Sequence, residues 1–304
     1  MEVFITGGSG FIGHALSQGL TEQGHGVTVL SRSAQGAGRL PVGVGTCLGD
    51  PTRPGAWQEE AARHQAFINL AGASIFERWN EPYKRLMLDS RVLSTRHLVE
   101  AIAKRPAGQP AVLISASAVG YYGFHGDEEL DETAPPGDDF LAQVCRQWEE
   151  EARKAEEASA RVVRARFGIV LGARGGALAK MLPLFRLGLG GPLGGGGQWF
   201  SWVHQHDMVQ AVLFCLADQS LNGPVNCTAP QPVSNRELSR ALGRALGRPA
   251  WLPAPSLAVR LALGEFASVV LRGQRVVPRV LGAQGFRFAF PTIDEALAGL
   301  PGLG

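Results

Sequence analysis

The fold is decided near the start of the chain, by Val3-Phe4-Ile5-Thr6-Gly7-Gly8-Ser9-Gly10-Phe11-Ile12-Gly13. A β-branched and aromatic run breaks into glycines, and an apolar helical spacing follows from Phe11. This order predicts a strand, a tight turn and a helix. A second β-branched run over 27–30 closes a βαβ unit of about thirty residues.

The three spaced glycines suit a turn that receives a dinucleotide. A pyrophosphate needs backbone N–H groups at the start of a helix, with no side chain between them and the phosphates. We expect Gly7 to form the turn, Gly10 to admit the phosphates and Gly13 to let the helix approach the sheet. A purely structural glycine turn is the alternative, but the strand–turn–helix–strand context favours dinucleotide binding.

The residues after the second strand indicate which dinucleotide binds. An acidic residue that hydrogen-bonds the ribose of NAD is usual at this place, whereas this chain has Ser31-Arg32. A guanidinium can grip a ribose phosphate through charge-assisted hydrogen bonds, and a hydroxyl can add another. NADP is therefore the predicted cofactor. Arg32 as a solvated loop residue is the alternative, and Arg39 is either a second phosphate contact or none.

Further strands follow at the spacing of βα units. Near-continuous apolar runs cover 66–72, 111–117 and 161–166, which is typical of strands buried on both faces. Helical patterns lie between them over 82–104, with Pro82 in the first turn, and over 139–158, where Asp138 or Asp139 can cap. The predicted fold is α/β, a Rossmann-type doubly wound parallel sheet. Its topology places 70–72 and 115–117 at the ligand crevice.

Composition excludes several classes of protein. The 304 residues are 45% hydrophobic and carry a net charge of +2, without a basic stripe for nucleic acid. Four separated cysteines suggest neither a zinc site nor a disulfide framework. No secretion signal or membrane-spanning run is recognised. We therefore expect a cytoplasmic protein with a small-molecule substrate and without nucleic-acid or membrane partners.

Several motifs together resemble a known superfamily. They are residues 6–13, Asn69-Leu70-Ala71-Gly72 and Ser115-Ala116-Ser117-Ala118-Val119-Gly120-Tyr121-Tyr122-Gly123. In these motifs the chain is similar to the extended short-chain dehydrogenase/reductases. Trp148-Glu149, Trp202-Val203-His204 and Gly273-Gln274-Arg275-Val276-Val277-Pro278 narrow the resemblance to an atypical branch, the "epimerase family protein" branch, nearly end to end.

The resemblance implies positions for the cofactor. Ser31 and Arg32 would hold the ribose phosphate, and Leu70 and Ala71 would lie along the adenosine and its linker. Arg91, on the following helix, would reach the cofactor, with Val170 near the nicotinamide end; a solvated Arg91 is the alternative. The complete set of predicted cofactor-binding residues is Gly7, Gly10, Phe11, Ile12, Ser31, Arg32, Leu70, Ala71, Arg91 and Val170.

The chemical part of the superfamily pattern is missing. The superfamily uses a tyrosine four residues before a lysine, whose charge lowers the pKa of the tyrosine. On the expected helix Phe140 or Leu141 stands in place of the tyrosine, and Val144 or Cys145 in place of the lysine. Ser117 matches the superfamily's serine.

Ser117 and Tyr121 are therefore the predicted catalytic residues, with Tyr122 as an alternative phenol. Arg166, Lys180 or His204 are possible helpers of the phenol that donates the proton. The competing interpretation is that the two tyrosines only pack over the crevice.

The segment 172–207 is rich in glycine, and we expect a substrate-facing loop there. Arg174, Lys180 and Arg186 either meet an anionic substrate or face solvent. His204 and His206 lack further ligands at suitable spacing, so no metal is predicted. Asp207 is expected to cap a helix over 208–216.

The chain is expected to divide into 1–230, the NADP-binding domain with the loop 172–207, and 231–304, a smaller substrate-side domain. An apolar helix over 256–271 should cover the crevice or form an interface.

The predicted function is an NADP-dependent oxidoreductase or nucleotide-sugar-epimerase-like enzyme acting on a carbonyl or hydroxyl. The alternative is an NADP(H) sensor without turnover. The superfamily also suggests a homodimer through 82–104 and 139–158.

Overall fold

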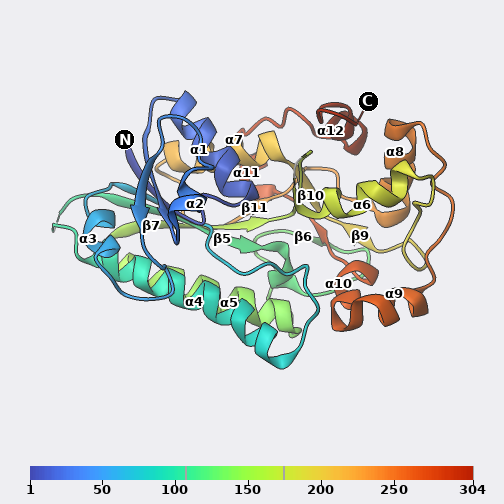
Figure 1. Ribbon diagram of the computed structural model, residues 1–304, viewed down its shortest axis with the longest axis horizontal. Coiled ribbons are helices and arrows are strands. Elements are labelled where there is room, and N and C mark those ends of the chain that lie inside the picture. The colour runs from blue at the N-terminus through green and yellow to red at the C-terminus, as the bar shows by residue number, and fades with distance from the viewer. Residues whose placement is uncertain (107, 174, 304) are drawn as a thin grey trace.

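The computed structural model of the chain describes residues 1–106, 108–173 and 175–303, and a seven-stranded sheet forms its centre (Figure 1). The strands lie in the order β11-β7-β5-β4-β1-β2-β3, and all neighbours run parallel. They are β1 (Glu2–Thr6), β2 (Gly26–Ser31), β3 (Gly45–Leu48), β4 (Ala66–Asn69), β5 (Ala111–Ala118), β7 (Ala160–Phe167) and β11 (Gly223–Cys227). The order reverses between β1 and β4, where a doubly wound sheet opens its ligand crevice. The predicted fold is confirmed.

Helices cover both faces of this sheet (Figure 1). One face carries α1 (Phe11–Glu22) and α7 (Gln205–Ala217), and the other carries α3 (Trp57–Ala61), α4 (Glu81–Ala103) and α5 (Phe140–Arg153). Successive strand residues point to opposite faces, so the inner strands β1, β2, β4, β5 and β7 each supply residues to both hydrophobic cores.

The starts of α4 and α5 follow from side-chain caps. The Asn80 side chain accepts a hydrogen bond from the Tyr83 backbone at 2.8 Å, and Pro82 lies in the first turn of α4. The Asp139 carboxylate accepts one from the Ala142 backbone at 3.1 Å. Asp139 is thus the cap of α5, and the alternative cap, Asp138, is not.

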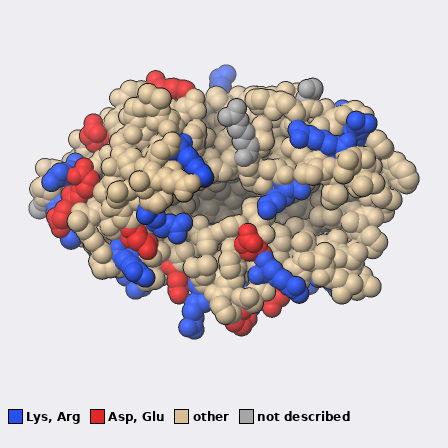
Figure 2. Space-filling model, viewed as in Figure 1, with Lys and Arg blue, Asp and Glu red and all other residues tan. Residues whose placement is uncertain are grey.

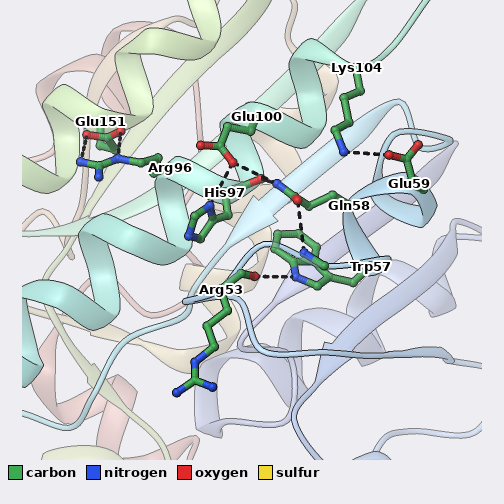
Figure 3. Close-up of polar contacts among 10 residues, drawn as sticks. Arg53, Trp57, Gln58, Glu59, Arg96, His97, Glu100, Lys104 and Glu151 are labelled. Atoms are coloured by element: carbon green, nitrogen blue, oxygen red, sulfur yellow. Dashed lines mark hydrogen bonds and ion pairs between the residues drawn. The ribbon is translucent and has the colours of Figure 1, made fainter.

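Polar contacts join the three helices of the second face (Figure 3). The Gln58 amide on α3 donates to the His97 carbonyl at 2.9 Å and to the Glu100 carboxylate at 3.1 Å, both on α4. Arg96 of α4 pairs with the buried Glu151 of α5 at 3.0 Å. These contacts fix α4 and α5 as one layer beside the crevice.

The C-terminal part builds a separate hydrophobic core from α6, α8 and α12, which pack Leu182, Leu238 and Leu297 around Trp202. The remaining elements are α2 (Ala34–Ala37), β6 (Glu129–Leu130), β8 (Ile169–Leu171), α6 (Gly176–Arg186), β9 (Trp199–Phe200), β10 (Trp202–His204), β12 (Val233–Ser234), α8 (Asn235–Leu246), α9 (Ser256–Leu263), α10 (Ala267–Leu271), β13 (Arg275–Val276), α11 (Arg279–Ala283) and α12 (Ile293–Ala298), with 3-10 turns over Val119–Tyr122, Lys154–Ala158 and Gly264–Phe266. The division of the chain at residue 230 stays a prediction.

Two expectations for the second half were wrong. The segment 172–207 is not a continuous loop, because α6 forms before the glycines begin at Gly188. The helix expected over 256–271 is interrupted at Gly264, whose φ of +60° leaves the helical region. In the described part of the chain, no helix combines the length and apolarity needed to cross a membrane.

The close contact between α1 and the first turn predicts a specific loss of stability. A Cβ at Gly13 would lie 2.4 Å from the Gly7 carbonyl oxygen and 2.5 Å from Gly8 Cα, both backbone atoms. Gly13→Ala should therefore lower the free energy of unfolding by about 1–3 kcal/mol, through overpacking, as measured by urea denaturation. Gly282→Ala is the matched helical control, because no atom lies within 4 Å of its Cβ position. Equal stability of the two variants contradicts the contact.

Candidate functional site

The turn after β1 leaves backbone amides uncovered at the start of α1. Gly7 has a φ of +73°, and a Cβ there would lie 2.7 Å from the Leu70 carbonyl carbon. A Cβ at Gly10 would meet only the Gly7 oxygen, at 3.3 Å, and no side chain caps the helix. Among the described residues, the amides of Phe11 and Ile12 have no hydrogen-bond acceptor. A helix start of this kind favours an anion.

A buried hydrogen-bond cluster fixes the end of β4 beside that turn. Thr6 donates to the Asn69 side chain at 2.7 Å, and Asn69 donates to Thr95 at 2.7 Å and to Ser115 at 3.3 Å. These contacts join β1, β4, β5 and α4 at the carboxyl end of the sheet. They hold the following Leu70 and Ala71 against Gly7, as expected for the crevice.

The two residues predicted to hold the ribose phosphate have different surroundings in the loop after β2. Ser31 is buried and donates to the Ser33 carbonyl at 2.9 Å, whereas Arg32 is exposed. The Ser33 hydroxyl caps α2 by accepting from the Gly36 amide at 3.2 Å. Ser31 therefore shapes the loop, and Arg32 and Ser33 are the groups that a ligand can reach.

Arg91 lies at the crevice and not in bulk solvent. A Cβ at Gly72 would come within 3.0 Å of the Arg91 guanidinium carbon. One guanidinium nitrogen donates to the Met87 carbonyl at 2.9 Å, and the group lies 5.2 Å from the Trp148 ring centre. Burial lowers the pKa of Arg91. Within the described chain no carboxylate pairs with it, so this desolvated cation can receive an anionic ligand group.

A chain of buried hydrogen bonds begins at Ser117. Its hydroxyl donates to the Glu149 carboxylate at 2.7 Å, and Arg166 grips the same carboxylate with two bonds of 2.8 and 2.9 Å. Arg166 also donates to the Tyr122 hydroxyl at 2.9 Å, which donates to Asn226 at 2.6 Å. Burial raises the pKa of Tyr122 to about 12. Tyr122 is thus a neutral structural phenol. Sequence reasoning missed Asn226 as its partner and Glu149 as the partner of Ser117 and Arg166.

The candidate replacements for the superfamily's tyrosine and lysine lie in different surroundings on α5. Leu141 and Cys145, four residues apart on α5, both lie against Gly120, at 3.5 and 3.9 Å from its Cβ position. Burial raises the pKa of the Cys145 thiol to about 12. Of the alternatives, Phe140 packs elsewhere, on Trp79. The described side chains of α5 thus place no titratable acid or base at neutral pH beside Gly120.

The surroundings of Tyr121 differ from those of the buried Tyr122. The Arg166 guanidinium carbon stands 3.5 Å from the centre of the Tyr121 ring. The residue is half-buried, and no hydrogen bond of its hydroxyl is formed within the described chain. Ser117 and Tyr121 thus both touch the Glu149–Arg166 pair.

Two further residues predicted to bind the cofactor, Val170 and Phe11, pack against other segments of the protein. Val170 is buried in β8 and pairs with Val203 of β10. The Phe11 ring packs under the glycines after β8, where a Cβ at Gly175 would lie 2.5 Å from it. No local sequence pattern predicts this contact between the dinucleotide turn and the segment after β8.

His204 and Asp207 have roles other than those expected. His204 accepts from the His206 amide at 3.2 Å and so begins α7, which Asp207 was expected to cap. Asp207 instead accepts from the Ala289 and Phe290 amides, at 2.9 Å each. Burial lowers the pKa of His204 to about 4, with the positive charge of His206 as the second cause. His204 is neutral near pH 7.

Between α2 and α6 the surface is hollowed, and charged side chains stand on its rim (Figure 2). Lys180 and Arg186 are exposed on α6, and Arg186 donates to the Gly302 carbonyl at 3.3 Å. Arg174 lies outside the described residues. Among the described residues, no group of three or more His, Cys, Asp and Glu is placed to hold a metal ion.

Comparison with known proteins agrees with this geometry. The model of the NAD dependent epimerase/dehydratase family matches residues 3–227, and a domain of unknown function, DUF1731, matches residues 254–300. The chain belongs to the NAD dependent epimerase/dehydratase family. One relative in this family is the chloroplastic epimerase family protein SDR39U1 homolog of Arabidopsis thaliana, 41% identical over 98% of this chain and 86% of that protein. Another is YfhF of Bacillus subtilis, 37% identical over 99% and 98%.

Solved structures of similar proteins extend the comparison. The crystal structure of human SDR39U1 with NADPH matches at a TM-score of 0.86 and 38% identity, over 98% of both chains. UDP-glucose 4-epimerase of Thermus thermophilus with NAD has a TM-score of 0.77 at 24% identity, over 98% of this chain and 97% of that one, and shares the fold. The predicted resemblance is confirmed, and the human relative carries the predicted cofactor type.

The burial of neutral His204 predicts a pH dependence of stability. The unfolded chain takes up a proton near the ordinary pKa of 6.5, whereas the folded protein does so near 4. The free energy of unfolding should therefore fall as the pH drops from 6.5 towards 4, by up to about 1.4 kcal/mol per pH unit. His204→Asn, which keeps a capping side chain, should flatten this slope in urea titrations. The exposed-site control His14→Asn should not, and an unchanged slope in His204→Asn contradicts the assignment.

Proposed function

We propose that the protein is an NADP(H)-dependent oxidoreductase, or an epimerase-like enzyme, that acts on a carbonyl or hydroxyl of a small molecule. One observation carries the proposal: the uncovered amides after Gly10 lie in one crevice with the desolvated Arg91, and Arg32 is exposed on the loop after β2. The human relative crystallised with NADPH supports the choice of cofactor.

The residues present fit this cofactor. The space beside Gly10, which any side chain would reduce, suits the pyrophosphate at the start of α1. Arg32 would hold the ribose phosphate with the Ser33 hydroxyl, and Leu70 and Ala71 would line the adenosine side. Arg91 adds a positive charge at the Gly72 wall. When bound, the cofactor supplies or accepts a hydride.

Ser117 and Tyr121 are the groups that we propose for the substrate oxygen. The Ser117 proton is directed at Glu149, so its oxygen retains lone pairs that can accept a hydrogen bond from a substrate hydroxyl. Tyr121 brings a phenol without a protein partner in the described chain, its ring held by Arg166. The Glu149–Arg166 pair thus orients both groups.

A specific observation favours a second candidate, an NADP(H) sensor without turnover. Leu141 and Cys145, one of the two pairs predicted in place of the superfamily's tyrosine and lysine, stand beside Gly120, and the Cys145 thiol stays protonated. This substitution removes the usual proton donor but leaves the cofactor turn complete.

We place the protein in the cytoplasm, because all four cysteines are free thiols, as is usual in a reducing compartment.

The homodimer through α4 and α5 stays a proposal drawn from the superfamily, and light scattering tests it by measuring the particle mass.

The exposed Arg32 predicts cofactor preference. Arg32→Gln should weaken NADPH binding about tenfold or more, because a charge-assisted contact to the ribose phosphate contributes about 1.5–3 kcal/mol, and should leave NADH binding unchanged. Titration calorimetry with both cofactors measures this. Arg53→Gln, at an 83% exposed side chain on another loop, is the control. Equal affinity of the wild-type protein for NADPH and NADH would refute NADP as the cofactor.

Turnover distinguishes the two candidate functions. In a screen of carbonyl compounds followed by NADPH absorbance, Ser117→Ala and Tyr121→Phe should each lower kcat by about 10²–10⁴-fold. Tyr83→Phe, at a half-buried tyrosine in the first turn of α4 that donates to the Ser74 carbonyl at 2.8 Å, is the matched control. NADPH binding without turnover of any compound would favour the sensor.

A further inference from the structure

A groove of about 750 Å³ runs along α8, in the C-terminal part of the molecule. Its walls come from the arginine-bearing face of α8 and the turn after it, from the glycine turn near Gly195, and from the segment at Trp251. None of the lining residues belongs to the cofactor turn, to Arg91 or to the Ser117 chain. Its volume is typical of small-molecule pockets.

Arginines repeat along one side of this groove. Arg236, Arg240 and Arg244 follow one another at intervals of four on α8, and Arg248 continues the row after the Gly247 cap. All four are exposed. Like charges at this spacing repel one another and destabilise a helix. An anion bound along the row would relieve this repulsion.

The protein neutralises only part of this row. Arg244 pairs with Asp294 at 2.6 Å, and Arg236 donates to the Gly195 carbonyl at 2.6 Å. In the described part of the chain, neither Arg240 nor Arg248 has a carboxylate within ion-pair distance. Figure 2 shows basic side chains gathered over α8 and α12. Two guanidinium groups remain available, and guanidinium forks match phosphate oxygens.

An exposed aromatic ring lines the same groove. Trp251 is 76% exposed, although large rings are usually covered in folded proteins. The backbone around it is held in place, because the Ala254 amide donates to the Pro192 carbonyl at 2.9 Å and the Gly194 amide to the Ala254 carbonyl at 2.8 Å. The indole is thus presented on a fixed wall, where a planar ring can stack on it.

We propose that this groove binds a nucleoside phosphate as a second ligand, separate from the dinucleotide crevice. Arg240 and Arg248 hold the phosphates, and the base stacks on Trp251. The groove combines concavity, small-molecule volume, cationic forks and one aromatic platform, which suits such a ligand better than a flat acidic protein surface. The groove is open around the glycines at 195 and 247, since no atom of the described residues lies within 4 Å of either Cβ position.

The experiment uses the full chain saturated with NADPH, so that ADP cannot enter the dinucleotide crevice. ADP is titrated by calorimetry and by tryptophan fluorescence, with inorganic pyrophosphate as a probe that lacks a base. We expect one ADP per chain with quenched fluorescence, and pyrophosphate at least tenfold weaker. The Arg240→Gln/Arg248→Gln variant should lose tenfold or more in ADP affinity, and Trp251→Leu should lose the quenching.

The control is Arg53→Gln/Arg63→Gln, which removes two arginines whose side chains are 83% and 75% exposed on the opposite half of the chain. It should bind ADP as the wild type does. NADPH titrations of every variant check the fold and keep this test separate from that of the proposed function. Pyrophosphate binding as tight as that of ADP overturns the base contact and the nucleotide class. Unchanged ADP affinity in Arg240→Gln/Arg248→Gln, or a parallel loss in the control, overturns the site.

Discussion

The crevice depends on three backbone segments that meet without side chains between them. The turn after β1 touches the end of β4 at Gly7 and the start of α1 at Gly13, at distances that a Cβ would violate. Because of this contact, the first backbone amides of α1 face outward at the point where the strand order reverses, between β1 and β4. The Asn69 cluster then locks β4 to its neighbours, so the turn has a rigid support.

The two ends of the crevice differ in chemistry. The phosphate end keeps the arrangement expected for a dinucleotide, with Arg32 exposed and Arg91 desolvated at the wall. At the reacting end, Leu141 and a protonated Cys145 stand beside Gly120, and neither offers a titratable group at neutral pH. The buried Glu149–Arg166 pair joins Ser117 to the tyrosine loop instead, so the polar groups of this end belong to one hydrogen-bonded unit.

The sheet could be predicted from the sequence because its strands are apolar runs with βα spacing. Each of these runs can be recognised from local sequence alone. Sequence reasoning left open whether Phe140 or Leu141 replaces the tyrosine, because helical periodicity tolerates a shift of one residue; in the structure Leu141 lies beside Gly120 and Phe140 packs on Trp79. The partnership of Glu149 with Arg166 depends on how α5 lies on β7, which local patterns do not encode. The anchoring role of Asp207 likewise depends on a tertiary contact, with the backbone amides of Ala289 and Phe290.

A crystal structure of the protein grown with NADPH tests the proposed cofactor site most directly. We predict that the pyrophosphate lies on the amides of Phe11 and Ile12, the ribose phosphate lies at Arg32, and the nicotinamide end extends towards Ser117. Density for the cofactor at another place, or a diphosphate turned away from the α1 start with saturating NADPH, would contradict it.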